Sequence, residues 1–236
     1  MIWLRSAIFN LGMWLMLIPF SLLAILLVPF PAPFRSRMVA GWACFVIWWL
    51  TLTCGVHYRV IGRENIPDQP CVILPKHQSA WETIALQVIF PPQVWVLKRS
   101  LLLLPFFGWA IWALKAIAID RSSGREALKQ LVSQGKDRLA LGLNVVVFPE
   151  GTRVAPGKRG KYHIGGAWLA THTSALAVPV AHNAGEFWPK NNLLKRSGTI
   201  TVSIGTPINT TGMKADELNR QVEAWIEAEM LRLPSL

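Results

Sequence analysis

Residues 74–83 contain the two side chains whose types and spacing best suit acid–base chemistry, His77 and Glu82. An imidazole, with an ordinary pKa of about 6.5, can accept a proton from an attacking hydroxyl group. A carboxylate bonded to its other nitrogen fixes the tautomer and stabilises the imidazolium. Two helical residues five apart diverge by about 140°, because a helix turns about 100° per residue. The pair can therefore meet only if His77 lies in a loop before a helix that contains Glu82.

A purely structural role for Glu82 fits the same residues. Ser79 and Glu82 have the spacing of a capping box, in which the Glu side chain accepts a hydrogen bond from the backbone N–H of the cap residue. Spacing alone does not separate this cap from a carboxylate that orients His77. Both interpretations are therefore kept as expectations.

A second candidate site is the turn at residues 148–153, which follows an apolar run typical of a buried strand. The segment ends in a glycine, a threonine and Arg153. A glycine turn can present backbone N–H groups, and the forked guanidinium of arginine binds phosphate through parallel hydrogen bonds. Further basic residues follow, namely Lys158, Arg159 and Lys161. The turn is a candidate phosphate site, with a solvated basic loop as the alternative.

The rest of the chain after the N-terminal region alternates short apolar runs with turns and amphipathic stretches, which is typical of an α/β fold. Strands are predicted at residues 58–61, 71–74, 94–97, 116–119, 145–148, 177–180 and 199–204. Helices are predicted at residues 80–89, 125–141, 166–173 and 215–231. The predicted fold is a mixed sheet flanked by helices, preceded by a two-helix apolar membrane anchor. The predicted domains are residues 1–57, the anchor, and residues 58–236, the α/β domain.

The anchor prediction rests on two long uncharged runs, Ser6 to Phe34 and Met38 to Tyr58. A spanning helix needs about 20 apolar residues, which both runs supply, although Pro19 interrupts the first. Because basic linkers tend to stay in the cytoplasm, Arg35 and Arg37 between the runs favour two helices embedded in one leaflet. A hairpin of spanning helices is the alternative. A cleaved signal peptide is disfavoured, since no small-residue cleavage site follows the first run.

Composition and charge limit the partners of this 236-residue chain. It is 52% hydrophobic with 12 Trp, and its formal net charge is +11 with a pI of about 10.1. Such a chain suits anionic lipid or a phosphorylated substrate. Nucleic acid is excluded as a partner, because the basic residues are not gathered into one tract. The three cysteines form no Cys-x-x-Cys pair and predict reduced thiols, and neither a metal-site spacing nor a Gly-x-Ser-x-Gly nucleophile is present.

The two candidate segments and their surroundings resemble the glycerolipid acyltransferase family, and within it the 1-acyl-glycerol-3-phosphate acyltransferases. The family's first motif is a His followed after four residues by an Asp, which His77 and Glu82 match except that Glu replaces Asp. Its third motif, Phe-Pro-Glu-Gly-Thr-Arg, is complete at residues 148–153. Its second motif, ending near Ile-Asp-Arg, resembles residues 107–121. Its fourth, an apolar run around a proline, resembles residues 177–180.

The resemblance implies a membrane enzyme of phospholipid biosynthesis. Such an enzyme transfers a fatty acyl group from acyl-CoA or acyl carrier protein to the 2-hydroxyl of 1-acyl-glycerol-3-phosphate, which gives phosphatidic acid. It needs no cofactor and no metal, and its partners are the lipid bilayer, the lysophospholipid acceptor and the acyl donor. The implied location is the cell membrane, the inner membrane in a bacterium, with the catalytic domain on the cytoplasmic side.

The resemblance also implies roles for individual residues. His77 is the general base that deprotonates the acceptor hydroxyl, which attacks the thioester directly, and Glu82 orients His77. The substrate phosphate is assigned to Arg153, with Arg121 and Lys98 as further candidates. The other residues assigned to substrate binding are Glu150, Gly151 and Thr152.

Other interpretations stay open. The acceptor can be a different lysophospholipid, or the chain can be a non-catalytic polybasic protein that binds membrane lipid. The apolar residues 101–109 either dip into the leaflet, line an acyl-chain tunnel or belong to the core.

The one departure from the first motif concerns the residue that orients His77. Glu in place of Asp adds one methylene to the orienting carboxylate, and a misplacement of a catalytic group by about 1 Å costs roughly 100-fold in rate.

Overall fold

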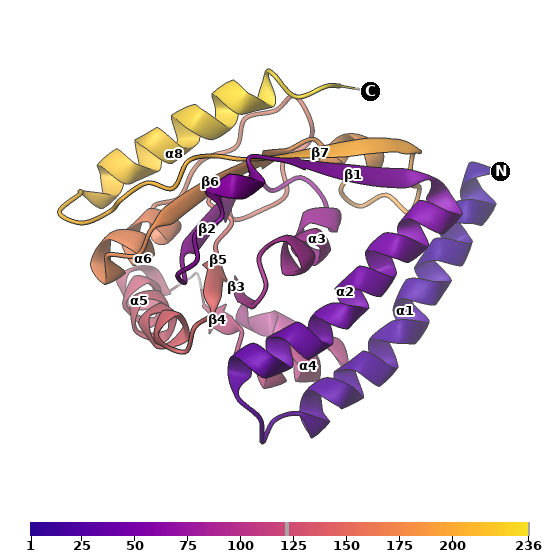
Figure 1. Ribbon diagram of the computed structural model, residues 1–236, viewed down its shortest axis with the longest axis horizontal. Helices are drawn as coiled ribbons and strands as arrows, with labels where there is room; N and C mark the ends of the chain where they lie inside the picture. The colour runs from indigo at the N-terminus through magenta and orange to yellow at the C-terminus, as the bar shows by residue number, and fades with distance from the viewer. Residues whose placement is uncertain (121–122, 236) are drawn as a thin grey trace.

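A computed structural model describes residues 1–120 and 123–235 of the chain, and within them seven strands form one sheet (Figure 1). The strands are β1 (Val56–Ile61), β2 (Val72–Pro75), β3 (Gln93–Lys98), β4 (Ile117–Ile119), β5 (Asn144–Val146), β6 (Ala177–His182) and β7 (Gly198–Ile204). Their order is β1-β7-β6-β2-β5-β3-β4. Neighbouring strands are parallel except β6 and β7. The mixed sheet is as predicted, and each predicted strand is confirmed with its ends shifted by a few residues.

Helices cover both faces of the sheet (Figure 1). Helix α3 (Trp81–Ile89) lies on one face with the N-terminal helices, while α5 (Gly124–Ala140), α6 (Gly165–Thr173) and α8 (Ala215–Met230) lie on the other. Every residue of β2 and β6 is buried, because a parallel strand covered on both faces has no solvent side. The four predicted helices are confirmed. The shorter helices, which were not predicted, are α4 (Phe107–Ala113), α7 (Ala184–Phe187) and the 3₁₀ segments η1 (Arg63–Asn65) and η2 (Arg99–Leu103).

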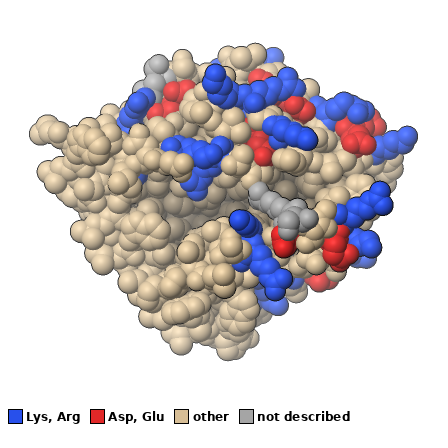
Figure 2. All heavy atoms as spheres, turned by 180° about the vertical axis from the view of Figure 1, so that it is seen from behind, with Lys and Arg blue, Asp and Glu red and all other residues tan. Residues whose placement is uncertain are grey.

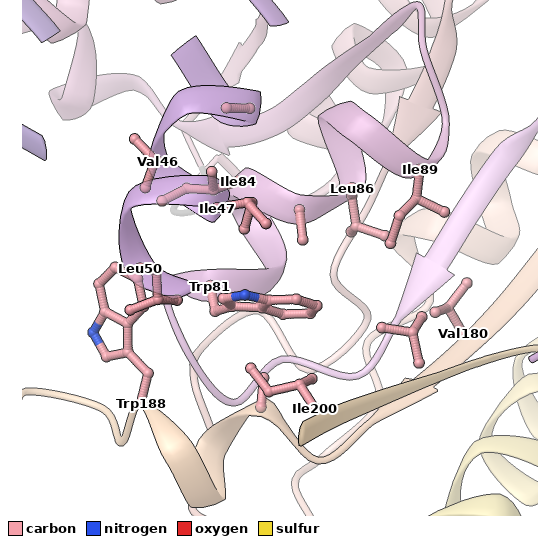
Figure 3. Close-up of a cluster of buried hydrophobic side chains, with 14 of the residues drawn as sticks. Val46, Ile47, Leu50, Trp81, Ile84, Leu86, Ile89, Val180, Trp188 and Ile200 are labelled. Carbon is pink, nitrogen blue, oxygen red and sulfur yellow. The ribbon is translucent and has the colours of Figure 1, made fainter. Parts of the chain in front are cut away.

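The core on the α3 face fixes the start of that helix. Trp81, the first residue of α3, is 1% exposed. Figure 3 shows its indole among the side chains of Leu50 from the second N-terminal helix and Ile200 from β7. Burying an aromatic ring of this size removes a large apolar area from water. The helix therefore begins at a defined position directly after the loop that contains His77.

The N-terminal region forms two antiparallel helices, α1 (Ile2–Leu26) and α2 (Ala32–Cys54). Both are long and apolar enough to cross a membrane by length and composition alone. Each buries one stripe, and Phe9 of α1 and Val46 of α2 share a core with Trp81 of α3. The helices thus lie along the α/β body (Figure 1). The domain division after residue 57 stays a prediction.

The position of the two basic residues between the apolar runs differs from the prediction. Arg35 and Arg37 lie within α2 and not in a linker, since α2 already begins at Ala32. Proline suits the first turn of a helix, where its missing N–H has no partner to lose, so Pro33 lies in the first turn of α2. Pro19 likewise lies inside α1, which continues past it. The single-leaflet arrangement stays a prediction.

Large apolar side chains are exposed on these helices and on the neighbouring η2–α4 segment. Trp3 and Trp14 of α1 are 69% and 60% exposed, Leu103 of η2 is 83% exposed and Trp112 of α4 is 62% exposed. Figure 2 shows a broad uncharged region on one face, with Lys and Arg side chains gathered on the rest of that face around a hollow. Soluble monomers rarely expose large contiguous apolar surface, so the exposed apolar side chains of α1, η2 and α4 support membrane association. The exposure of residues 101–109 also excludes the interpretation of that whole segment as core.

Candidate active site

The candidate site residues follow the carboxyl ends of parallel strands. His77 follows β2, Lys98 ends β3, and residues 148–153 follow β5. Parallel strands end at one edge of the sheet, here called the carboxyl edge, and ligands of open α/β sheets bind there. The fold therefore brings these residues to one region. Arg121 lies outside the described residues.

His77 and Glu82 are in direct contact. His77 precedes α3 and Glu82 lies in its first turn, which is the arrangement that helical geometry requires. His77 Nδ1 lies 2.9 Å from Glu82 Oε1, so the longer glutamate side chain reaches the imidazole. The Glu82 side chain is 1% exposed and that of His77 is 14% exposed. The imidazole thus has one nitrogen held by a buried carboxylate, and its other nitrogen, Nε2, has no hydrogen-bond partner among the described residues and is available to a substrate.

Glu82 also caps the helix, so the two interpretations of its role are compatible. Its Oε1 accepts hydrogen bonds from the backbone N–H groups of Gln78 at 2.9 Å and Ser79 at 2.8 Å. The Ser79 hydroxyl accepts from the Trp81 N–H and donates to the Trp188 carbonyl oxygen, instead of capping the Glu82 N–H. The glutamate half of the capping box is present. These N–H groups fix the carboxylate that holds His77.

A second histidine, His182 at the end of β6, lies next to Glu82 and was not predicted as a site residue. Its Nε2 donates to the Lys76 carbonyl oxygen at 2.8 Å and lies 4.0 Å from Glu82 Oε2. Burial alone would raise the pKa of Glu82, but His182, His77 and the Ser79 N–H outweigh it, so the pKa lies below its usual value. Glu82 is therefore ionised at neutral pH. The position of His182 at the carboxyl end of a predicted strand was the available signal.

The buried His182 predicts that folding stability falls in mild acid. Burial lowers the pKa of His182 and outweighs the attraction of Glu82, so the folded protein holds this proton more weakly than the unfolded chain. The free energy of unfolding is therefore highest above about pH 6.5, the pKa of His182 in the unfolded chain. It falls as the pH decreases from there toward the lower pKa of His182 in the folded protein. We expect the melting temperature to fall between about pH 7 and pH 5, and to fall less in His182→Gln. Equal slopes in the two proteins would contradict this account.

The turn at residues 148–153 also holds His77, through its ring and through its backbone. The Phe148 ring stacks on the His77 imidazole with ring centroids 4.0 Å apart. Glu150 Oε2 accepts the His77 backbone N–H at 2.9 Å, and the Val154 N–H donates to the His77 carbonyl oxygen at 2.7 Å. Both polar groups of the His77 backbone are therefore bonded to this loop. Glu150 is 2% exposed, so its carboxylate shapes the loop from inside.

Two basic residues, Arg153 and Lys98, follow or end strands on the same side of β2, toward β5 and β3. Gly151 has φ +65°, a conformation that favours glycine, and it turns the chain toward the exposed Thr152 and the half-buried Arg153. Within residues 1–120 and 123–235, no carboxylate lies within ion-pair distance of the Arg153 guanidinium. Lys98 is exposed at the end of β3, two strands or about 10 Å from β2. These cations suit an anionic substrate group.

A model of the acyltransferase family matches residues 57–183, more than half of the chain, and the chain belongs to this family. It is 48% identical over 207 residues to the 1-acyl-sn-glycerol-3-phosphate acyltransferase of Pseudomonas aeruginosa, which covers 85% of this chain and 80% of that protein. It is 31% identical to the enzyme of the same name from Saccharomyces cerevisiae, over 74% of this chain and 62% of that protein. The crystal structure of the 1-acyl-sn-glycerophosphate acyltransferase PlsC from Thermotoga maritima matches with a TM-score of 0.81 at 20% identity, over 98% of this chain and 95% of that one. The last match shows the shared fold.

Proposed function

We propose that this acyltransferase moves a fatty acyl group from a thioester to the 2-hydroxyl of 1-acyl-glycerol-3-phosphate and so makes phosphatidic acid. The thioester is acyl-CoA or acyl carrier protein. The observation that carries the proposal is His77, whose Nδ1 is held by the buried carboxylate of Glu82 and whose backbone is bonded to the loop that contains Arg153. The name of the bacterial relative at 48% identity supports the acceptor. The reaction serves phospholipid biosynthesis.

The proposed reaction is direct transfer with no acyl-enzyme. His77 Nε2 takes the proton of the acceptor hydroxyl as the oxygen forms a bond to the thioester carbonyl carbon. The tetrahedral intermediate collapses, the carbon–sulfur bond breaks, and the imidazolium returns its proton to the leaving thiolate. Glu82 stabilises the imidazolium between the two steps, and its backbone hydrogen bonds hold it in place. The chain has no Gly-x-Ser-x-Gly segment, which agrees with a mechanism without a serine nucleophile.

Arg153 is proposed to bind the phosphate of the acceptor, with Lys98 and Arg121 as further cations. We expect Arg153→Ala to raise KM for the phosphorylated acceptor by about 10- to 100-fold, because a charge-assisted hydrogen bond is lost. KM for the thioester should change by less than about twofold. Arg220→Ala removes the same charge from an exposed position on α8 and serves as the matched control. Equal increases of KM for both substrates would overturn the phosphate assignment.

The exposed apolar helices are proposed to keep the active site at the membrane, since the acceptor and the product are both lipids. Helices α1 and α2 lie in one leaflet, and the catalytic body faces the cytoplasm at the inner membrane. A shallow apolar cleft of about 290 Å³ lies on this surface between α1 and α4. Its lining residues are Ile25, Leu102, Gly108, Trp109 and Trp112. The cleft supports contact of this region with lipid chains.

Product analysis tests the acceptor. The purified protein is incubated with a long-chain acyl-CoA and with one of three acceptors: 1-acyl-glycerol-3-phosphate, 1-acyl-glycerol, or a lysophospholipid with a larger headgroup. Phosphatidic acid from the first acceptor is expected at a kcat/KM at least tenfold above that of 1-acyl-glycerol, which lacks the phosphate, because a hydrogen bond to a charged group contributes about 1.5–3 kcal/mol and about 1.4 kcal/mol is a factor of ten. It should also exceed the kcat/KM of the acceptor with the larger headgroup. Preference for the larger headgroup would assign the enzyme to another lysophospholipid. No product with either acyl-CoA or acyl carrier protein would favour a non-catalytic lipid-binding protein.

A further inference from the structure

The residue directly before the proposed base is a fully buried cation. Lys76 is 1% exposed, and its Nζ lies 2.8 Å from Glu150 Oε1 and 2.7 Å from Glu227 Oε1. Successive residues of an extended chain point to opposite faces of a sheet. Lys76 accordingly reaches α8, which contains Glu227, whereas His77 bonds to Glu82 of α3 on the other face. One short segment thus connects both helical layers.

The first carboxylate links Lys76 to the backbone of His77. The Glu150 side chain is 0% exposed, and an ionised carboxylate at such depth is unfavourable unless cations and N–H groups compensate it. Its Oε1 binds the Lys76 ammonium, and its Oε2 binds the His77 N–H. Without Lys76 the buried carboxylate would lose its cation and the loop would have to rearrange. The contact that fixes the His77 backbone therefore depends on Lys76.

The second carboxylate fixes Lys76 from the far side of the sheet. Glu227 also accepts a hydrogen bond from the Tyr162 hydroxyl at 2.7 Å. Burial, and then this hydrogen bond, raise the pKa of Tyr162, so its hydroxyl remains a donor. The Lys76 ammonium also lies 5.7 Å from the centroid of the Tyr162 ring. A continuous series of contacts thus runs from α8 to the His77 N–H, and Glu227 lies outside the residues that the family model matches.

We propose that Lys76 and Glu227 are positioning residues for His77, which act together through Glu150 to hold the imidazole at the distance required for proton transfer. This inference rests on the proposed role of His77 as general base. The Lys76 ammonium is bonded to Glu150 and Glu227, and Glu227 Oε1 accepts from Lys76 and Tyr162, so the contacts of both side chains lie on the α8 side of the sheet, opposite the His77 imidazole. Their loss should therefore change the placement of the base and not the binding of substrate.

The expected effect falls on kcat. A misplacement of a catalytic group by about 1 Å costs roughly 100-fold, so we expect Lys76→Met and Glu227→Leu each to lower kcat by about 10- to 100-fold. KM for acceptor and thioester should stay within about twofold. Glu227→Gln should keep kcat within about threefold, because its amide oxygen can still accept from Lys76 and Tyr162. The double variant Lys76→Met with Glu227→Leu should lose no more than the worse single variant, since residues that act as a unit are not additive.

The matched control is Glu223→Leu, one helical turn earlier on α8. Glu223 binds the exposed Arg159 at 2.6 Å, so it also joins α8 to the loop after the active-site turn, but without Lys76. It should retain the kcat of the wild type. A loss in Glu223→Leu as large as that in Glu227→Leu would show that docking of α8 in general is what matters, which overturns the proposal.

Two further results would contradict the inference. One is a folded Glu227→Leu protein with the kcat of the wild type, and the other is additive losses in the double variant. If Lys76→Met does not fold, the Glu227 variants decide alone, because that side chain is 22% exposed and tolerates replacement more easily. Failure of the proposed function looks different, since the wild type and His77→Ala would then show equal acyl transfer.

Discussion

Replacing His77 by alanine is expected to lower kcat by about 100- to 10,000-fold, the range that a general base contributes. The physical reason is that Nε2 is the proton acceptor for the attacking hydroxyl, and the neighbouring ionisable side chains that the structure describes, Glu82 and His182, cannot take its place. Glu82 is buried and bonded to Gln78 and Ser79, and His182 donates its Nε2 hydrogen to a carbonyl oxygen. KM for both substrates should change little, because phosphate and thioester bind elsewhere.

Steady-state kinetics of purified His77→Ala, with its melting temperature, check this expectation. His57→Ala is the matched control, since His57 is exposed on β1, far from the carboxyl ends of β2 and β5 in strand order. It should behave as the wild type. A folded His77→Ala protein that retains more than about a tenth of the wild-type kcat would refute the assignment of the general base.

Glu82→Gln should lower kcat by about 100-fold or more, although glutamine also serves a capping box. If its amide oxygen takes the place of Oε1, it keeps the helix cap but brings no negative charge to the imidazolium. Its amide N–H₂ then faces the Ser79 N–H, which lies 3.1 Å from Oε2 in the native protein, and donors repel. If the amide turns over, its N–H₂ faces His77 Nδ1 and enforces the tautomer with the proton on Nε2. Both orientations impair the base.

The measurement compares kcat and melting temperature for Glu82→Gln and for Glu64→Gln, an exposed position on η1. A large loss of kcat in Glu82→Gln with a small change in melting temperature indicates that the carboxylate orients His77. Turnover within about twofold of the wild type, in the folded variant, would mean that Glu82 only caps α3.

The sheet could be predicted because each strand is a short apolar run between turn residues, and β2 and β6 show this most clearly. Helix α4 was missed, since it has only seven residues, is apolar almost all round and contains Gly108. Arg35 and Arg37 were misplaced because the prolines before them indicate a break equally well as a helix start. The sequence thus predicts the layers better than the short connections between them.

The candidate site could be predicted only as far as local spacing extends. His77 and Glu82 are five residues apart, and helical geometry decides whether they meet. The contacts of His182 with Lys76 and of Lys76 with Glu227 span 106 and 151 residues of the chain, and no spacing rule predicts them. The stacking of Phe148 on His77 likewise depends on β5 lying beside β2. These contacts depend on strand order, which a single sequence does not reveal.

The most direct test of direct acyl transfer at His77 is thiol release from a long-chain acyl-CoA by the detergent-solubilised protein, with and without 1-acyl-glycerol-3-phosphate. The account predicts release that requires the acceptor, matches the phosphatidic acid formed one to one, and disappears in His77→Ala. Release that is independent of the acceptor and persists in His77→Ala would contradict it. So would the absence of release from both acyl-CoA and acyl carrier protein.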